Sequence, residues 1–236
     1  MVAVIGDVHG CYHTLKELVD KIKNKYPNIK IFCVGDLVDR GNNSFEVIEF
    51  VVAEKIQCVI GNHDFMFYSN MRDPFSLMAK SWNYNGAETT LASYKDKLNQ
   101  IDKHLDLIIN SPLFFNLDDC FISHAGISKS LKDKLPENFL SDDAALKEIL
   151  SNDLFNQNSI IWARGDLLNI GKLQVVGHTH RKEVYFDKVS NAIYIDTTAF
   201  GNNKLSAAIV EQNNLVEIID QKTNADDVNR NWIYQL

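Results

Sequence analysis

Short apolar runs alternate with amphipathic segments over the first part of the chain. Apolar runs occupy residues 2–5, 29–34 and 57–60, and a glycine follows each of them. Between these runs, apolar residues recur at helical spacing over residues 15–22 and 45–52. A short apolar run that ends at a glycine is typical of a buried strand, and a period near 3.6 residues is typical of a helix. We therefore predict three successive β-α units, whose right-handed crossovers favour a largely parallel central sheet.

The starts of the first two helices carry polar capping signals. Thr14 and Glu17 have the spacing of a capping box, and Ser44 precedes the second apolar stripe. Such side chains bond to backbone N–H groups that have no partner in the first helical turn. We expect Thr14 to cap the first helix and Ser44 the second.

The rest of the chain has two further patterns. Residues 63–110 predict helices with a break at Asn85-Gly86, and we interpret them as a small helical cap inserted into a single domain of residues 1–236. The second half is predicted to be mostly antiparallel β, with hairpins that pair residues 113–117 with 120–123, 184–189 with 192–195, and 205–211 with 215–219. Trp232 and Tyr234 in the polar tail indicate that it folds back onto the protein.

Composition and charge narrow the functional class. The 236 residues are 45% hydrophobic and 23% charged, which is the balance of a globular protein with a core. The formal net charge is −7, so the overall field repels nucleic acids and anionic membranes, and we expect neither as a partner. The start of the chain lacks the features of a signal peptide, and no run of 18 apolar residues occurs. Together with four scattered cysteines, these features predict a cytoplasmic protein.

Chemically active residues follow the predicted strands. The loops read Gly6-Asp7-Val8-His9-Gly10, Gly35-Asp36-Leu37-Val38-Asp39-Arg40-Gly41, Gly61-Asn62-His63-Asp64, Ser123-His124-Ala125-Gly126 and Gly177-His178-Thr179-His180. Loops at the carboxyl ends of parallel strands meet at one edge of a sheet, where ligands bind. The candidate metal ligands are Asp7, His9, Asp36, Asn62, His124 and His178. This set of oxygen and imidazole donors, without a thiolate, suits manganese, iron or zinc, and a bridging Asp36 would hold two ions.

Two further features suit phosphoryl chemistry. Arg40 and Arg164 can bind phosphate oxygens in a bidentate manner, which compensates for the negative net charge. His63, if hydrogen-bonded to Asp39, could be held protonated and donate to the leaving oxygen as a general acid.

The ordered motifs resemble those of the phosphoprotein-phosphatase family of calcineurin-like metallophosphoesterases. The residues that carry the resemblance are Gly6-Asp-x-His-Gly10, Gly35-Asp-x-x-Asp-Arg-Gly41, Gly61-Asn-His63, Ser123-His124 and Gly177-His178-Thr179. The small lambda-type bacterial and phage protein phosphatases and the diadenosine tetraphosphate hydrolases are similar. The resemblance implies an α/β fold with a central β-sandwich flanked by helices, in place of the plain doubly wound sheet. It also implies that Asp7, His9 and Asp36 hold the first metal, and that Asp36, Asn62, His124 and His178 hold the second.

Three positions depart from the family pattern. Asp64 stands where protein phosphatases usually have Glu, a choice shared with the dinucleoside tetraphosphate hydrolases. His180 follows Thr179 where proline is common, which leaves open whether it is an additional metal ligand. Thr198 ends an Asp-Thr-Thr sequence in place of Asp-Thr-Gly, and we expect the local backbone to differ because threonine rarely adopts a positive φ angle.

The sequence predicts a binuclear metal-dependent phosphomonoester hydrolase that uses a metal-bound hydroxide as nucleophile. The first substrate prediction is a phosphoserine or phosphothreonine protein or peptide, and the alternative is symmetrical hydrolysis of a bis(5'-nucleosyl)-tetraphosphate such as diadenosine tetraphosphate. A small phosphoester is also compatible with the site. Manganese is the metal expected in vitro, with iron or zinc as alternatives. A catalytically silent binding module is disfavoured because both Asp36 and His63 are present.

Some predictions concern the helical cap. We expect His104 to lie on the surface of its helix. Trp82, Tyr84 and Asn85 either line the entrance to the site or pack the cap. The metal's identity, the substrate and the oligomeric state are not determined by the sequence.

Overall fold

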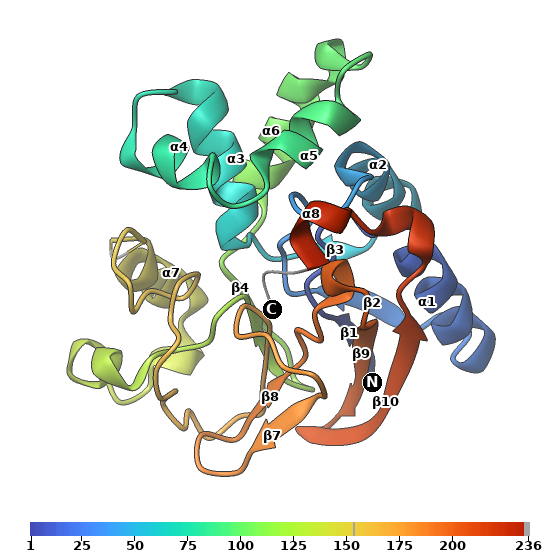
Figure 1. Ribbon diagram of the computed structural model, residues 1–236. Helices are drawn as coiled ribbons and strands as arrows, with labels where there is room; N and C mark the ends of the chain where they lie inside the picture. The colour runs from blue at the N-terminus through green and yellow to red at the C-terminus, as the bar shows by residue number, and fades with distance from the viewer. Residues whose placement is uncertain (153, 234–236) are drawn as a thin grey trace.

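The computed structural model describes residues 1–152 and 154–233, and its strands form two five-stranded sheets (Figure 1). The first sheet has the strand order β10-β9-β1-β2-β3. Its strands are β1 (Val2–Ile5), β2 (Lys30–Cys33), β3 (Gln57–Cys58), β9 (Lys204–Glu211) and β10 (Asn214–Lys222). The predicted parallel pairing of β1 with β2 and of β2 with β3 is confirmed, but β9 and β10 extend the sheet in antiparallel fashion. The sheet is therefore mixed.

The second sheet has the order β4-β5-β6-β8-β7. Its strands are β4 (Phe114–Asn116), β5 (Phe121–Ser123), β6 (Gln174–Val176), β7 (Tyr185–Asp187) and β8 (Ala192–Tyr194). All three predicted hairpins are present, as β4 with β5, β7 with β8, and β9 with β10. The expectation of a mostly antiparallel second half is wrong in the centre of this sheet, where β6 pairs in parallel with β5 and β8. The long connection between β5 and β6 allows that parallel crossover.

The space between the two sheets is filled by alternate residues of their strands. Val4 and Phe32 from the first sheet lie in one buried cluster with Ile122, Val175 and Ile193 from the second. The intervening residues of the first sheet point the other way, toward helices. Side chains that alternate across a strand in this way are what two packed sheets with covered outer faces require. The fold is the predicted α/β sandwich flanked by helices.

Helices cover the sandwich and extend beyond one end of it (Figure 1). Those of the first β-α units are α1 (Tyr12–Lys25) and α2 (Ser44–Glu54), and α1 buries Leu15, Leu18, Val19 and Ile22. Between β3 and β4 the chain forms α3 (Asn62–Arg72), α4 (Leu77–Trp82), α5 (Ala87–Ser93), η1 (Leu98–Gln100) and α6 (Ile101–Asn110). The later elements are η2 (Lys129–Lys134), η3 (Phe139–Ser141), α7 (Asp143–Ser151), η4 (Ala199–Gly201), η5 (Ala225–Asp227) and α8 (Arg230–Ile233). None of the helices in the described part of the chain has both the length and the apolar character needed to span a bilayer.

The helical region between β3 and β4 agrees with the predicted helices and break, with one exception. Gly86 has a φ angle of 106° at the start of α5, and a Cβ atom there would lie 2.7 Å from the backbone nitrogen of Arg40. His104 is fully buried rather than on the surface. Its ring nitrogens lie 2.6 Å from the Tyr94 hydroxyl and 2.7 Å from a Glu49 carboxylate oxygen. The polar ring is tolerated inside because both of its nitrogens have partners.

The start of α1 is capped by a residue from the other end of the sequence. The carboxylate of Asp227 accepts hydrogen bonds from the backbone nitrogens of His13 and Thr14, at 3.0 and 2.7 Å, and from the Thr14 hydroxyl at 2.7 Å. The predicted capping box of Thr14 is therefore wrong, because the helix begins earlier and the hydroxyl serves Asp227. The predicted cap at Ser44 is also wrong, since Asn43 is the N-cap of α2, and the backbone nitrogen of Phe45 in the first turn donates instead to the Ser93 hydroxyl at 2.9 Å.

The tail folds back onto the protein as predicted. Asp227 is fully buried, and its Oδ1 atom also accepts a hydrogen bond from the side-chain nitrogen of Asn43 at 3.0 Å. Trp232 is buried and donates from its indole nitrogen to Glu88 at 2.7 Å. Tyr234 lies outside the described residues. Residues near the end of the described chain thus hold the starts of α1 and α2, next to the loops that carry His9 and Arg40.

Candidate active site

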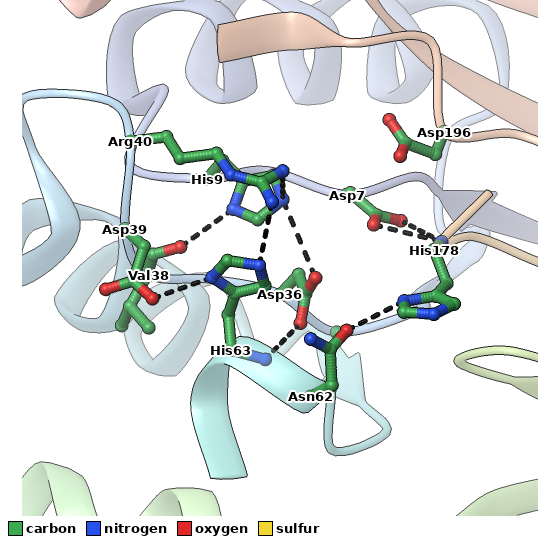
Figure 2. A network of polar contacts seen from close by, with 12 residues as sticks. Asp7, His9, Asp36, Val38, Asp39, Arg40, Asn62, His63, His178 and Asp196 are labelled. Atoms are coloured by element: carbon green, nitrogen blue, oxygen red, sulfur yellow. Dashed lines mark hydrogen bonds and ion pairs between the residues drawn. The ribbon is translucent and has the colours of Figure 1, made fainter. Parts of the chain in front are cut away.

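The structure brings all six predicted metal ligands together at one edge of the sandwich, and Figure 2 labels five of them: Asp7, His9, Asp36, Asn62 and His178. Each follows the carboxyl end of a strand, and all are at most 4% exposed. Asp7 and His9 follow β1, Asp36 follows β2, and Asn62 opens α3 just after β3. His124 and His178 follow β5 and β6 of the second sheet. The site is therefore assembled from the loops of both sheets.

The loops that carry these residues have strained or closely packed backbones. His9, Asp36 and His178 have φ angles of 45°, 51° and 61°, in the left-handed region that side chains other than glycine rarely adopt. Each such residue costs about 1–3 kcal/mol, which the surrounding fold must offset. Gly61 and Gly177 allow two loops to approach the carboxylates, because a Cβ atom would lie 2.1 Å from Oδ1 of Asp36 and 1.9 Å from Oδ1 of Asp7, respectively.

Asp36 lies at the centre of two groups of candidate ligands. Its Oδ2 atom is 3.5 Å from Nε2 of His9 and 3.4 Å from Nε2 of His124. In the described chain there are two groups of possible metal ligands, and within each group the ligand atoms lie within 4.8 Å of one another. The first group is His9, Asp36 and His63, and the second is Asp36, His124 and His178. Asp36 belongs to both groups, as the prediction of a bridging carboxylate requires. Asp7 belongs to neither group, and its carboxylate accepts from the backbone nitrogen of His178 at 3.0 and 3.3 Å.

Unprotonated ring nitrogens converge on Asn62. His124 donates from Nδ1 to the Val34 carbonyl at 2.8 Å, which leaves Nε2 without a proton. His178 donates from Nε2 to the Trp162 carbonyl at 3.2 Å, which leaves Nδ1 without a proton. Both of these free nitrogens lie 2.8 Å from Oδ1 of Asn62. Three lone pairs that face one another repel unless a cation lies between them, so the donor set fits a divalent metal ion.

The electrostatics of the cluster also indicate a cation. Burial raises the pKa of Asp7 and Asp36, the latter to about 7, and neighbouring carboxylates add to the shift. Burial lowers the pKa of His9 and His178 and lowers that of His124 to about 4. The imidazoles are therefore neutral, and in the described part of the chain no lysine or arginine lies within ion-pair distance of Asp7 or Asp36, whose pKa the more distant Arg40 lowers only in part. Bound divalent ions would stabilise the ionised carboxylates.

The predicted acid pair is present and rigidly held. Nδ1 of His63 lies 2.7 Å from Oδ2 of Asp39. Trp82 donates its indole N–H to both Asp39 oxygens at 2.9 Å, and the Thr90 hydroxyl donates to Oδ1 at 2.8 Å. Trp82 thus neither lines the entrance nor merely packs the helices, because it positions Asp39. By contrast, Tyr84 is 84% exposed.

Arg40 binds two histidines of the first ligand group. Its Nη1 and Nη2 atoms donate to Nε2 of His9 at 3.1 Å and to Nε2 of His63 at 3.0 Å, and its guanidinium lies 4.5 Å above the ring of Phe200. Because arginine only donates, Nε2 of His63 carries no proton in this arrangement. Burial, followed by the charge of Arg40, lowers the pKa of His63. The expectation that Asp39 keeps His63 protonated therefore does not describe this state of the site.

The two remaining predicted residues lie at the rim. Arg164 is exposed, and its Nη1 donates to the backbone carbonyl of His178 at 3.1 Å. This places its guanidinium beside the second ligand group. His180 is exposed as well, and in the part of the chain that the structure describes it belongs to neither ligand group.

Sequence reasoning missed the roles of several buried polar residues. Asp196 is 2% exposed, and burial raises its pKa beside the other carboxylates. Asp196 comes two residues after the end of strand β8. An acidic residue just after a short apolar run was the signal that identified Asp7, and the same signal could have identified Asp196. Asp64 accepts from the backbone nitrogens of Leu37 and Gly61 at 2.8 and 3.1 Å, and this ties two site loops together.

The Asp-Thr-Thr segment keeps a left-handed backbone. Thr198 has φ and ψ angles of 60° and 52°, so the threonine adopts the positive φ angle that this residue type rarely adopts. Its backbone nitrogen donates to Oδ1 of Asp196 at 2.9 Å. This bond, two residues back along the chain, helps to hold the turn against the steric cost of the β-branched side chain.

Comparison with known proteins agrees with this geometry. The model of the calcineurin-like phosphoesterase family matches residues 1–182. The chain belongs to this family. Its members use a binuclear divalent metal centre, which agrees with the two ligand groups that share Asp36. The chain is accordingly a metallophosphoesterase.

Similar curated proteins and structures extend over most of the chain. The asymmetrical bis(5'-nucleosyl)-tetraphosphatase PrpE of Oceanobacillus iheyensis is 33% identical, with 93% of this chain and 92% of the relative covered. PrpE of Bacillus subtilis, with the same description, is 31% identical over 86% of this chain and 88% of its own. The crystal structure of a cold-active protein-tyrosine phosphatase from a Shewanella species superposes with a TM-score of 0.62 at 20% identity, over 94% of this chain and 80% of that one. That structural match supports the fold.

Proposed function

We propose that this metallophosphoesterase hydrolyses bis(5'-nucleosyl)-tetraphosphates asymmetrically. The observation that carries the proposal is the pair of ligand groups joined by Asp36, in a chain that is more than 30% identical to asymmetrical tetraphosphatases over most of its length. An asymmetrical cut adds water across an outer bridge of the tetraphosphate and yields a nucleoside monophosphate and a nucleoside triphosphate. The relatives support the substrate class of the alternative prediction, with a different cleavage position, over a phosphoprotein.

We assign the metal ligands as the family motif suggests. Asp7, His9 and Asp36 would hold one ion, and Asp36, Asn62, His124 and His178 would hold the other. Bound there, the two ions would supply an activated water and offset charge on the phosphate. Manganese remains the metal predicted in vitro, with iron or zinc as alternatives, because all three accept this donor set.

Arg40 and Arg164 would orient the substrate. Both guanidinium groups lie beside the ligand groups, and both can bind phosphate oxygens through two N–H groups. If Arg40 turns toward a phosphate, it gives up its bond to Nε2 of His63. That nitrogen can then carry a proton and donate it to the leaving oxygen, while Asp39 holds the opposite side of the ring.

The test compares products and substrates with one preparation. Manganese-loaded protein is incubated with diadenosine tetraphosphate, and the nucleotides are separated by chromatography. The proposal expects AMP and ATP in equal amounts, and a kcat/KM at least about a hundredfold above that for a phosphoserine peptide. ADP as the main product would contradict the asymmetrical cut. A peptide preference of the same size would restore the phosphoprotein prediction.

A further inference from the structure

A basic cavity lies beside the second ligand group. Apart from Arg164, its lining residues have no part in the chemistry described above. It has a volume of about 650 Å³, which is within the range that holds a nucleotide-sized ligand. Arg164 and Thr179 are in its lining, and they connect it to the site. Arg164 donates to the His178 carbonyl, and Thr179 follows His178 directly. A molecule bound at the metal ligands can therefore extend into the cavity.

The charge of the cavity is opposite to that of the whole chain. Four cationic side chains line it, and they are Lys129, Lys132, Arg164 and Arg181. Its two carboxylates are Asp166 and Asp187, and Asp187 already accepts hydrogen bonds from the Val189 nitrogen at 3.0 Å and the Ser190 hydroxyl at 2.5 Å. No carboxylate among the described residues lies within ion-pair distance of Lys129, Lys132 or Arg181. In a chain with a net charge of −7, these cations favour a polyanionic ligand.

Part of the lining of the cavity consists of flat side chains. The Arg181 guanidinium lies 4.5 Å from the ring centre of Tyr185 and 5.0 Å from that of Tyr194. The ring of Tyr185 is 46% exposed, so one side of this stack is accessible. Aromatic rings and arginine planes are surfaces on which nucleobases stack. The cavity thus combines phosphate-binding cations with a stacking surface.

A second cavity, on the other side of Arg164, has a different character. It measures about 580 Å³, and Phe155, Trp162 and Met78 contribute to its lining, with Arg164 as its sole cationic group among the described residues. A cavity with this single cationic group suits the short arm of a substrate cut at an outer phosphate. The basic cavity suits the longer and more negative arm.

We propose that the basic cavity binds the nucleoside triphosphate arm of the substrate, with phosphates on Lys129, Lys132 and Arg181 and the base on Tyr185. This inference rests on the proposed function, because it assigns a place to one half of the same substrate. On this proposal, cleavage falls at an outer phosphate because the two cavities that share Arg164 differ in charge.

The test measures binding rather than turnover. The dissociation constants of a non-hydrolysable ATP analogue, adenosine 5'-(β,γ-imido)triphosphate, and of AMP are measured by calorimetry on the manganese-loaded protein. Lys129→Gln with Lys132→Gln should weaken binding of the triphosphate by about a hundredfold, since each of the two lost charge-assisted contacts is worth about tenfold. Binding of AMP should weaken by much less. Arg181→Gln, tested separately, should give the same pattern with a loss of about tenfold.

The controls separate a binding effect from a general one. Lys80→Gln with Lys95→Gln removes the same charge from exposed positions outside the cavity and should leave both constants unchanged. Thermal unfolding checks that the Arg181→Gln variant is folded. If that variant is unfolded, the variant of Lys129 and Lys132 still tests the proposal, because both lysines are exposed and their replacement should not affect folding. Equal triphosphate affinity in the wild type and the lysine variant would overturn the assignment. Tighter binding of a phosphoserine peptide than of the triphosphate, lost in the same variants, would also overturn it.

The failure of this inference can be told apart from the failure of the proposed function. If diadenosine tetraphosphate stays intact but the lysine variant loses triphosphate affinity, the cavity is a nucleotide site and the proposed reaction is wrong. If AMP and ATP are formed but the lysine variant binds the triphosphate like the wild type, the reaction stands and the cavity assignment is wrong.

Discussion

Nη2 of Arg40 lies 3.0 Å from Nε2 of His63, and the guanidinium can only donate in this contact. Nε2 of His63 therefore carries no proton while Arg40 stays in place. A phosphate that draws Arg40 away would free this nitrogen. In the proposed mechanism, substrate binding and protonation of His63 would thus be coupled through one side chain.

Replacement of His63 by asparagine should affect substrates according to their leaving groups. Hydrolysis of an alkyl phosphate should fall by about 10²–10⁴-fold, because the departing alkoxide needs a proton. Hydrolysis of p-nitrophenyl phosphate and of diadenosine tetraphosphate should fall much less, since their leaving groups are weaker bases. Steady-state kinetics on all three substrates measure this difference. Equal losses on all of them would contradict the acid role.

Asp36→Asn should remove both metal ions. The substitution eliminates a charge shared by the two ligand groups, so metal content should fall from about two ions per chain to below one, and kcat should fall by about 10³-fold or more. Elemental analysis of the purified protein and a phosphatase assay measure the two effects. Asp96→Asn, an exposed acid far along the sequence, is the matched control and should change neither quantity. Full metal content in the Asp36 variant would rule out a bridging role.

Thr198→Gly should stabilise the protein. The left-handed conformation costs a side-chain-bearing residue about 1–2 kcal/mol, and glycine avoids that cost but adds about 0.4–1 kcal/mol of backbone entropy to the unfolded chain. The net gain in the free energy of unfolding should be about 0.5–1 kcal/mol. Urea unfolding monitored by circular dichroism measures it. A loss of more than about 1 kcal/mol would show that the threonine side chain makes contacts that outweigh the backbone strain.

Asp227→Ala should destabilise the protein. It leaves four donors without their acceptor, two of them buried on Thr14 and two half-buried on His13 and Asn43, and uncaps α1. We expect a loss of about 2–4 kcal/mol, which lowers the melting temperature by roughly 4–16 °C for a chain of this size. Thermal unfolding measures the change. Asp226→Ala, at the exposed neighbouring position, should shift the melting temperature by less than a quarter of that amount.

The parts of the site that could be predicted are those that local sequence determines. Asp7 and Asp36 directly follow short apolar runs, and the carboxyl ends of adjacent parallel strands must meet, so their approach follows from strand order. The six candidate ligands are Asp, His and Asn residues, and these residue types indicated metal binding without any knowledge of the fold. These arguments need no knowledge of contacts between distant segments.

The parts that could not be predicted depend on contacts between distant residues. Thr90 and Trp82 bind Asp39 across 51 and 43 positions of sequence, and nothing in their local pattern distinguishes them from packing residues. Thr14 has a good capping signal, but Asp227 provides the stronger acceptor from 213 positions away. The basic cavity likewise joins η2 to the β7-β8 hairpin, and neither segment carries a recognisable motif.

The contacts of Asp227, and the central position of β9 beside β1, also affect how the protein is made. Residues 204–211 must leave the ribosome before β1 gains its second neighbour, and residue 227 must follow before α1 is capped. At about 5–20 residues per second, some 220 residues of translation separate Asp7 from Asp227, or roughly 10–40 s. Until residues 204–211 emerge, the nascent chain exposes the apolar edge of β1, and a strand edge left open in this way is prone to aggregation and is the kind of surface that chaperones protect.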